Sequence, residues 1–292
     1  MRKVDIGMCS YRNPECLIKA LASITEKCSD VDYRLLIVDN HSDDKITYDI
    51  LYKCAKADPR ITLKLLEENK WYQGAVNEFL KWSEAEYIFY VENDAQVLTD
   101  RAADKLAIQL DEAPQIGIIG PSNIGCLGIN KGNYTEVFWF AGFAWMMKRS
   151  TYLEVGLLDE AIGHQNEIDY QIRVRLAGKK IAIANNVTIA HHATTSLNPD
   201  ATERINKGVE EWMNKWLGYF CGKDHADYDY TVQKYDYLRM TDWNVCARYL
   251  EEYFKQFVPD LNAHPETIVI EGVEYDLLKV PRAKNYYTGR II

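Results

Sequence analysis

The feature that most constrains the fold is a regular alternation of short apolar, β-rich runs with helical patterns over the first half of the chain. Strands are expected at residues 4–9, 33–39, 61–66 and 87–91, and helices at 14–27, 45–57 and 71–83. Four consecutive apolar residues at 35–38 indicate a strand that is buried on both faces. The alternation therefore predicts an α/β fold, with a mostly parallel, Rossmann-like central sheet flanked by helices.

The pattern continues, less regularly, into the second half of the chain. Further helices are expected at 101–112 and 167–177, and further strands at 116–119, 137–147 and 181–189. From about Pro199 the texture changes to segments rich in Trp and Tyr with helical character, and a β-hairpin is expected at 267–279. We expect an α/β domain over residues 1–198 and a mainly helical extension over 199–292.

Composition excludes some partners and indicates a compartment. A formal net charge of −9 argues against a broad electrostatic grip on nucleic acid. Seven cysteines are scattered without a C-x-x-C pair, which is typical of reduced thiols in the cytoplasm. The N-terminus does not resemble a signal peptide, and no run of about 18 apolar residues predicts a membrane span.

Polar clusters follow three of the expected strands directly. Ser10, Tyr11 and Arg12 follow the first, Asp39 ends the second, and Glu92-Asn93-Asp94 follows the fourth. Ligands of parallel sheets bind beyond the carboxyl ends of the strands, where the strand order reverses. Two carboxylates there could hold Mg²⁺ or Mn²⁺ against phosphate oxygens, although Asn and Asp are also common in solvated turns.

Several segments read together carry a resemblance to a known family. They are VDIGMCSYRNPECLIKALASI, LLIVDNHSDD, NKWYQGAVNEFLKWSEAEYIFYVENDAQV and GLLDEAIGHQNEIDYQIRVRLAGKKIAIANNVTIAHHATTS. Over roughly residues 3–196 the chain resembles family 2 glycosyltransferases of the GT-A fold. It departs from the family where the D-x-D motif begins with Glu92, and where Cys9-Ser10-Tyr11-Arg12 replaces the more usual Pro-Thr-Tyr-Asn.

The resemblance implies a UDP-sugar donor held by a divalent cation. Asp94 and His191 would ligate Mn²⁺ or Mg²⁺, and Asp39 would accept the uracil N–H. Tyr11 would be available to stack on the base. The full donor-binding set expected is Ser10, Tyr11, Arg12, Asp39, Asn69, Gly74, Asn77, Glu92 and Asn93.

The general base is expected in the acidic group of the 167–177 helix. Glu167 and Asp169 are two residues apart, so they point about 200° apart and cannot face one cleft together. Asp169 has an i,i+4 partner in Arg173, which favours a structural role for it. Glu167 falls where the family carries its base; it is favoured, and both residues remain candidates.

The predicted function is an inverting, metal-dependent transfer of a sugar from a UDP-sugar to an acceptor hydroxyl. Alternatives are a nucleotide-sugar-binding module without catalysis and a nucleotidyltransferase, although SYRNPE is not a Gly-rich phosphate loop. The acceptor stays open among a glycan, a protein, a small molecule and a modified nucleobase. The extension is a candidate for acceptor recognition or for contacts within a homo-oligomer.

Overall fold

The structure is a computed structural model that describes residues 1–122, 128–137, 139–163, 166–192, 207–208, 211–212, 215, 267–270 and 273–276. The chain divides into two compact units, Met1–Gly208 and Val209–Ile292. The predicted boundary after residue 198 lies outside the described residues and stays a prediction. In the second unit, β12 (Thr267–Ile270) pairs antiparallel with β13 (Val273–Asp276), as the expected hairpin requires.

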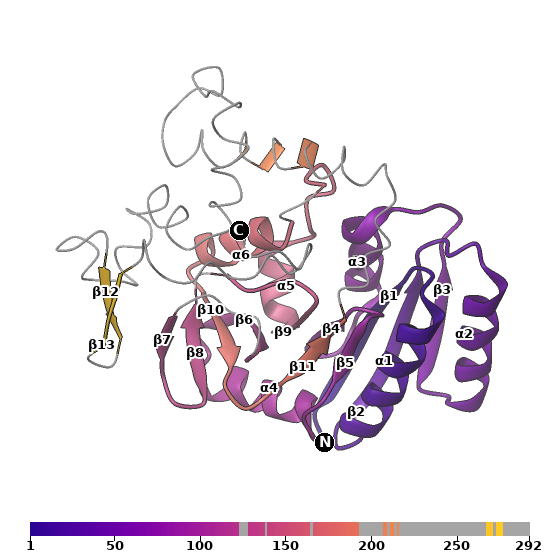
Figure 1. The fold of residues 1–292 in the computed structure, drawn as a ribbon, viewed down its shortest axis with the longest axis horizontal. Coiled ribbons are helices and arrows are strands. Elements are labelled where there is room, and N and C mark those ends of the chain that lie inside the picture. Colours follow the sequence, from indigo (N-terminus) through magenta and orange to yellow (C-terminus); the bar gives the residue numbers. More distant parts are fainter. Residues whose placement is uncertain are drawn as a thin grey trace. The chain divides into compact units, whose positions relative to one another are not determined.

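The first unit is built on a nine-stranded sheet of order β3-β2-β1-β4-β9-β6-β10-β8-β7 (Figure 1). Its first half is parallel: β1 pairs with β2 on one side and with β4 on the other, and β2 pairs with β3. These strands are β1 (Lys3–Ser10), β2 (Asp32–Asp39), β3 (Ile61–Leu65) and β4 (Tyr87–Val91). The mostly parallel α/β sheet predicted from the alternation is confirmed.

The second half of the sheet is mixed. Strand β9 (Ala144–Lys148) runs antiparallel between β4 and β6 (Ile116–Pro121), and β10 (Lys180–Ala184) is parallel to β6. Strands β8 (Tyr134–Val137) and β7 (Gly128–Asn130) complete the edge, both in antiparallel pairing.

Two strands expected in this half were wrong in extent. The run 137–147 was expected as one strand, but β8 ends at Val137 and β9 begins at Ala144. The run 181–189 was also expected as one strand, but a turn at Asn185 and Asn186 separates β10 from β11 (Ile189–His191). Strand β11 leaves the main sheet and pairs antiparallel with β5 (Ala95–Val97), which the sequence did not predict.

Helices cover both faces of the sheet. Successive side chains of a strand point to opposite faces, so a strand that is apolar throughout needs a helix layer on each side. Leu35 and Ile37 of β2 belong to one buried cluster, and Leu36 and Val38 belong to the other. The first cluster includes residues of α1 (Pro14–Lys27), α2 (Lys45–Ala57) and α4 (Ala102–Glu112). The second includes residues of α3 (Trp71–Trp82) and α6 (Asn166–Leu176), with α5 (Arg149–Val155) packed against it.

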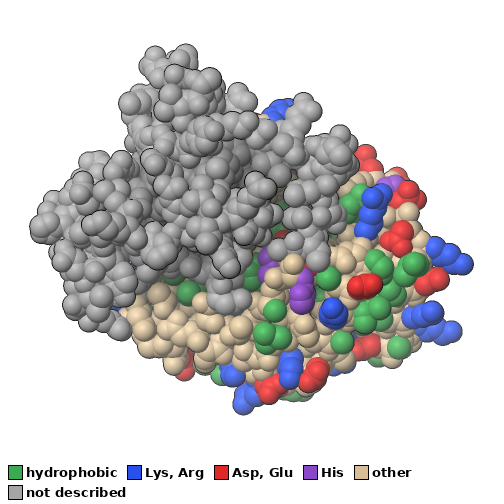
Figure 2. All heavy atoms as spheres, viewed as in Figure 1, with side chains coloured by type: hydrophobic (Ala, Val, Ile, Leu, Met, Phe, Trp, Pro, Cys, Tyr) green, Lys and Arg blue, Asp and Glu red, His purple; other side chains and the backbone are tan. Residues whose placement is uncertain are grey.

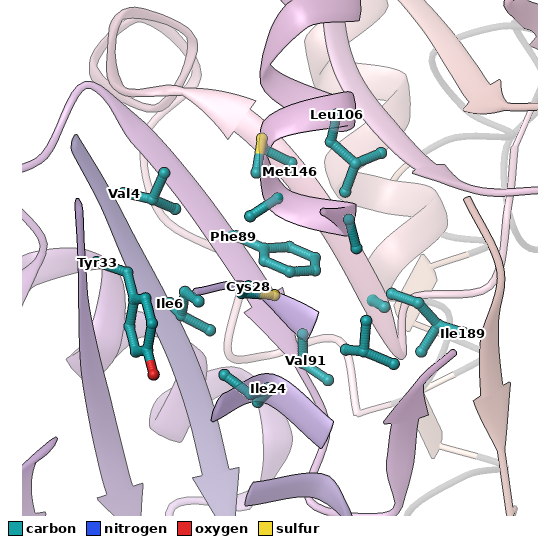
Figure 3. Packing of buried hydrophobic residues seen from close by; sticks show 14 of the residues in the cluster. Val4, Ile6, Ile24, Cys28, Tyr33, Phe89, Val91, Leu106, Met146 and Ile189 are labelled. Atoms are coloured by element: carbon teal, nitrogen blue, oxygen red, sulfur yellow. The ribbon is translucent and has the colours of Figure 1, made fainter. Parts of the chain in front are cut away.

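The first cluster is continuous across the sheet. Figure 3 shows Phe89 of β4 among Val91, Leu106 and Met146, so residues from three different elements share one apolar interior. On the other face, α3 lies very close to β1, since a Cβ at Gly7 would sit 2.3 Å from the Phe79 ring. Glycine at this position lets α3 approach the strand closely.

The surface of the described residues carries both signs of charge. Figure 2 shows Lys and Arg side chains interspersed with Asp and Glu on the visible face, rather than a field of one sign. No helix within the described ranges has the length and apolar character needed to cross a membrane.

Candidate active site

The site lies at the carboxyl edge of the parallel strands, beside the point where the strand order changes direction. Strand β1 has β2 on one side and β4 on the other, so the chain connects outward on both sides of it. The loops after β1 and β4 therefore diverge at this edge, which is where open α/β sheets bind their ligands. All three polar clusters predicted from the sequence are on these loops or on the loop after β2.

Three side chains at this edge form a candidate metal site. The ligand atoms of Glu92, Asp94 and His191 all lie within 4.8 Å of one another. The Nε2 atom of His191 is 3.3 Å from Glu92 Oε2 and 3.3 Å from Asp94 Oδ1. Their side chains are 25%, 12% and 20% exposed, so a ligand can reach them from solvent.

The backbone explains why residues so distant in sequence meet. Glu92 and Asp94 occupy the turn between β4 and β5, and β11 pairs with β5 so that His191 is opposite Ala95. The His192 N–H donates to the Asp94 carbonyl at 3.0 Å and closes the turn against the strand. The short β5–β11 ladder is thus what brings the histidine to the two carboxylates.

The two carboxylates of the cluster attract positive charge. Burial alone would lower the pKa of His191, but hydrogen bonds with Asp94 and Glu92 raise it to about 10. Burial raises the pKa of Glu92; His191 lowers it, and the negative charges of Asp94 and Glu167 raise it further. Two carboxylates and an imidazole nitrogen also form a donor set suited to Mn²⁺, which would displace the histidine proton.

Phe143 holds the histidine ring in place. Phe143 stacks on His191 with ring centroids 4.3 Å apart and an interplanar angle of 17°. The carbonyl of Phe143 accepts from the Glu92 N–H at 2.9 Å. Phe143 therefore contacts the cluster through both its ring and its backbone.

Asp39 ends β2 and lies beside the loop after β1. Its side chain has no exposed surface and accepts from the Ser42 hydroxyl at 2.5 Å and from the Ser42 N–H at 2.9 Å. Burial raises the pKa of Asp39, and the hydrogen bonds from Ser42 oppose this shift. The structure thus brings Ser10 and Asp39 together, as predicted, through a hydroxyl-rich environment.

The loop after β1 is tied to both neighbouring loops. The Arg12 N–H donates to Ser42 Oγ at 2.9 Å, and its guanidinium lies 5.0 Å from the centroid of the Tyr11 ring. Asn93 donates to the Arg12 carbonyl at 3.3 Å and so links this loop to the metal cluster. The predicted residues Tyr11, Arg12 and Asn93 are therefore neighbours.

Asparagines brace the start of α3. The Asn40 amide donates to Asn69 Oδ1 and to the Trp71 carbonyl, both at 3.0 Å, and Asn40 Oδ1 accepts from the Lys70 N–H at 2.8 Å. Several non-glycine residues along this edge have a left-handed φ. Such a φ is strained for residues other than glycine, and strain of this kind often occurs at functional sites. Such residues in these loops are Arg12, Asn13, His41, Asp43 and Trp71, with φ from 50° to 62°.

Two residues expected at the donor floor make other contacts. Gly74 faces its own helix, where an added Cβ would lie 2.6 Å from Lys70 Cβ. Asn77 is buried; it donates to the Leu158 carbonyl at 3.0 Å and accepts from the Leu158 N–H at 2.8 Å. Asn77 therefore fixes the segment that leads toward α6, and its contact with a donor stays a prediction.

The two base candidates have different surroundings. Asp169 is fully buried and accepts from Arg173 Nε at 3.0 Å, with Arg173 Nη2 2.9 Å away, which is the expected i,i+4 pair. Glu167 is only partly buried and lies against Gly142, and its charge acts on Glu92. The geometry thus separates a carboxylate within the protein interior from one that adjoins the candidate metal cluster.

Sequence reasoning did not identify Asn40, Ser42 or Tyr72 as individual site residues. Asn40 and Ser42 belong to the polar run that begins at Asp39, which was a usable signal. Nothing local distinguished Tyr72, because its hydroxyl binds the Gly142 carbonyl, 70 positions away in the sequence.

Comparison with known proteins gives a family and a fold. The profile described as Glycosyl transferase family 2 matches residues 5–156. The poly(ribitol-phosphate) beta-N-acetylglucosaminyltransferase TarP of Staphylococcus aureus (strain N315) is 32% identical over 108 residues, which are 36% of this chain. The matched stretch is 32% of TarP, so the chain spans about a third of the length of this curated relative.

Two solved structures resemble the fold at low sequence identity. GalNAc-T7 with UDP, GalNAc and Mn²⁺ has a TM-score of 0.63 at 10% identity, covering 90% of this chain and 58% of that chain. The mannosyltransferase PcManGT from Pyrobaculum calidifontis, in complex with GDP-Man and Mn²⁺, has a TM-score of 0.57 at 17% identity. That match covers 73% of this chain and 65% of the mannosyltransferase. Together these likenesses confirm the predicted GT-A fold.

Proposed function

The chain belongs to glycosyl transferase family 2, and on that premise we propose that it is an inverting glycosyltransferase that moves a hexosyl group from a UDP-sugar to an acceptor hydroxyl. The observation that carries the proposal is the cluster of Glu92, Asp94 and His191 with Glu167 beside it. A site for a cation and a separate carboxylate near it are the two chemical needs of such a transfer.

In the proposed mechanism, Asp94 and His191 hold a divalent cation, with Glu92 as a further ligand or as a partner through water. When bound, the cation would neutralise the negative charge of the leaving diphosphate. The three ligand residues fit this role, since their ligand atoms already lie close together, are partly exposed and attract positive charge.

Glu167 acts as the general base. It takes the proton of the acceptor hydroxyl while that oxygen attacks the anomeric carbon from the face opposite the leaving group. The bond between the anomeric carbon and the diphosphate oxygen breaks, and UDP leaves with the electron pair. Holding both reactants in line supplies much of the remaining acceleration.

The nucleoside end of the donor lies over β1 and β2 in this proposal. Ser42 uses one lone pair on each Asp39 oxygen, and a carboxylate has about four acceptor sites. Asp39 would then also accept the N–H of a uracil ring once the loop around Ser42 moves to expose it, with Tyr11 as the stacking surface. Asn69 would support this floor through Asn40.

A donor panel with metal tests the proposal. The protein is incubated with UDP-GlcNAc, UDP-GalNAc, UDP-glucose and GDP-mannose in the presence of Mn²⁺, and release of the nucleoside diphosphate is measured. We expect a UDP-sugar to be turned over and Asp94→Ala to abolish turnover. Unchanged turnover in Asp94→Ala would remove the metal site from the mechanism.

The same panel separates the alternatives. Binding of UDP by calorimetry without turnover on any acceptor would favour a nucleotide-sugar-binding module. Formation of a UDP-sugar from UTP and a sugar phosphate would favour a nucleotidyltransferase. Acceptors to include are a glycan, a peptide, a small polyol, a modified nucleobase and, because TarP carries that name, a poly(ribitol phosphate).

We also propose a cytoplasmic location. The described cysteines Cys9, Cys16, Cys28 and Cys54 carry free thiols, which is the usual state in a reducing compartment. Cell fractionation of the native protein would test this placement. Contacts of the C-terminal extension with an acceptor or with a second copy remain proposals as well.

A further inference from the structure

Three elements meet at one small residue beside the candidate base. An added Cβ at Gly142 would lie 2.8 Å from Glu167 Cβ, 3.5 Å from Glu167 Cγ and 3.4 Å from the Tyr72 hydroxyl. Glycine is thus required for the close approach of α6 to this backbone segment. Residue 142 stands between the aromatic ring of α3 and the carboxylate of α6.

Tyr72 holds this backbone directly. Its hydroxyl donates to the Gly142 carbonyl at 3.1 Å. The ring packs edge-on against Tyr90 with centroids 5.7 Å apart, and Tyr90 in turn stacks on Trp145 at 5.2 Å. The ring therefore has a fixed orientation that does not depend on its hydroxyl.

The hydroxyl stays protonated and available as a donor. Burial and the negative charges of Glu92 and Glu167 raise the pKa of Tyr72 well above its ordinary value. A hydrogen bond with Trp145 lowers it in part. Tyr72 thus lies within the electrostatic reach of both Glu92 and Glu167. Its hydroxyl binds the backbone at Gly142, which adjoins Glu167.

The segment from Phe140 to Phe143 connects the helix that carries Glu167 with the candidate metal cluster. Gln171 of α6 brackets Phe140, accepting from its N–H at 3.0 Å and donating to its carbonyl at 2.8 Å. Phe143 stacks on His191 and accepts from the Glu92 N–H. The backbone at Gly142 therefore lies between an anchor on the base helix and an anchor on the metal cluster.

We propose that Tyr72 is a positioning residue, whose hydroxyl fixes Gly142 and thereby sets the place of the Glu167 carboxylate relative to Glu92, Asp94 and His191. The inference rests on the proposed function, because it takes Glu167 as the base. It adds a residue outside both the metal cluster and the acidic helix. A shift of about an ångström in a catalytic group can cost a large factor in rate, so such an anchor has kinetic consequences.

The test compares Tyr72→Phe with a matched variant, Tyr87→Phe. Tyr87 also loses one hydroxyl hydrogen bond, to Asp111 at 2.7 Å, but it begins β4 at the opposite edge of the sheet. With UDP-GlcNAc and Mn²⁺, or the best donor of the panel, Tyr72→Phe is expected to lower kcat about tenfold. KM for the donor and the Kd for Mn²⁺ should stay within about twofold, and Tyr87→Phe should leave kcat unchanged.

A double variant isolates the route of the effect. If Tyr72 acts through Glu167, adding Tyr72→Phe to Glu167→Gln should not lower the residual rate further. An additional tenfold loss in the double variant would overturn the inference, since it would show an effect independent of the base.

Crystal structures supply a readout that needs no turnover. In Tyr72→Phe the Gly142 carbonyl and the Glu167 carboxylate are expected to move from their wild-type positions, while Phe143 and His191 stay stacked. Unmoved Glu167 together with unchanged kcat would overturn the inference. A wild-type protein that turns over no donor would instead contradict the proposed function, and the crystal structures would still decide the role of Tyr72.

Discussion

The Phe143 ring lies almost parallel to the imidazole of His191, with centroids 4.3 Å apart. The stacked ring limits rotation of the histidine and keeps Nε2 between Glu92 and Asp94. The candidate metal site is therefore shaped by an apolar residue that ligates nothing.

Phe143→Leu tests this support. Loss of the stacked ring should weaken Mn²⁺ binding about tenfold, because residues that orient metal ligands typically contribute 10- to 100-fold in affinity. Isothermal titration with Mn²⁺ measures the effect, and Phe89→Leu serves as a control in the same core cluster. Equal Mn²⁺ affinity in Phe143→Leu and wild type would contradict the role.

Metal binding should stabilise the fold. At a concentration of Mn²⁺ one hundred times its Kd, the free energy of unfolding should rise by about 2.7 kcal/mol if only the folded state binds. Thermal denaturation with increasing Mn²⁺ measures the shift, and EDTA should reverse it. Asp94→Asn should show no dependence on Mn²⁺, whereas the surface variant Asp100→Asn should behave as wild type; an equal shift in both would place the ion elsewhere.

Glu167→Gln and Asp169→Asn should fail in different ways. Glu167→Gln should keep the melting temperature and lower kcat by about 10²- to 10⁴-fold, the usual contribution of a general base. Asp169→Asn removes the charge of a buried carboxylate that pairs with the partly exposed Arg173, so it should destabilise the fold by about 2 kcal/mol. Chemical denaturation and steady-state kinetics on both variants decide; loss of kcat in a stably folded Asp169→Asn alone would reverse the assignment.

Asp5 should make stability depend on acid pH. It is 1% exposed and accepts from Arg34, Ser83 and the N–H groups of Glu84 and Ala85. Burial alone would raise the pKa of Asp5, but these donors hold it below its ordinary value of 3.8. A lowered folded-state pKa means that the contribution is complete above pH 3.8 and is lost as pH falls below it.

Asp5→Asn therefore should cost about 3 kcal/mol at pH 7, and the gap to wild type should narrow as pH falls toward 3. Urea denaturation of both proteins at several pH values measures this. Glu86→Gln, a change at an exposed side chain near the same edge, is a suitable control. A gap that stays constant with pH would contradict the linkage.

Asn77→Ala should loosen the segment before α6. Both of its hydrogen bonds to Leu158 are buried, and their loss leaves a backbone donor and acceptor unsatisfied, at a cost of about 2 kcal/mol. Denaturation measures the loss, with the exposed Asn133→Ala as control. Hydrogen exchange should rise at Leu158, and protection equal to wild type would contradict the proposed contact.

The parallel half of the fold was predictable because its signals are local. Helices Pro14–Lys27 and Lys45–Ala57 and strand Tyr87–Val91 have the expected bounds, since a helix-starting proline, an apolar period and a short buried run each act within a few residues. The polar residues that end these strands were correctly placed at one edge for the same reason.

The mixed half of the sheet was harder to predict from sequence, because contacts between residues far apart in the chain decide where its strands end and how they pair. The aromatic run from Val137 to Met147 suits a strand throughout, yet Gln171 and Tyr72 bind the backbone of Phe140 and Gly142 and interrupt the ladder. His191 was predicted near the metal, but the pairing of β11 with β5 that brings it there has no local signal. The roles of the individual site residues remain predictions that the experiments above address.

The β5–β11 ladder also has a consequence for the order of folding. Ala95 and His191 are partners in a ladder of only three residue pairs. Forming this ladder closes a very long loop, which costs entropy, and gains only a few hydrogen bonds in return. Strands β1 to β4 can assemble on a nascent chain while β11 is still unmade. Until β11 pairs, the carboxylates of the turn after β4 would stay solvated and repel each other, and a bound cation would favour the pairing of β11 with β5.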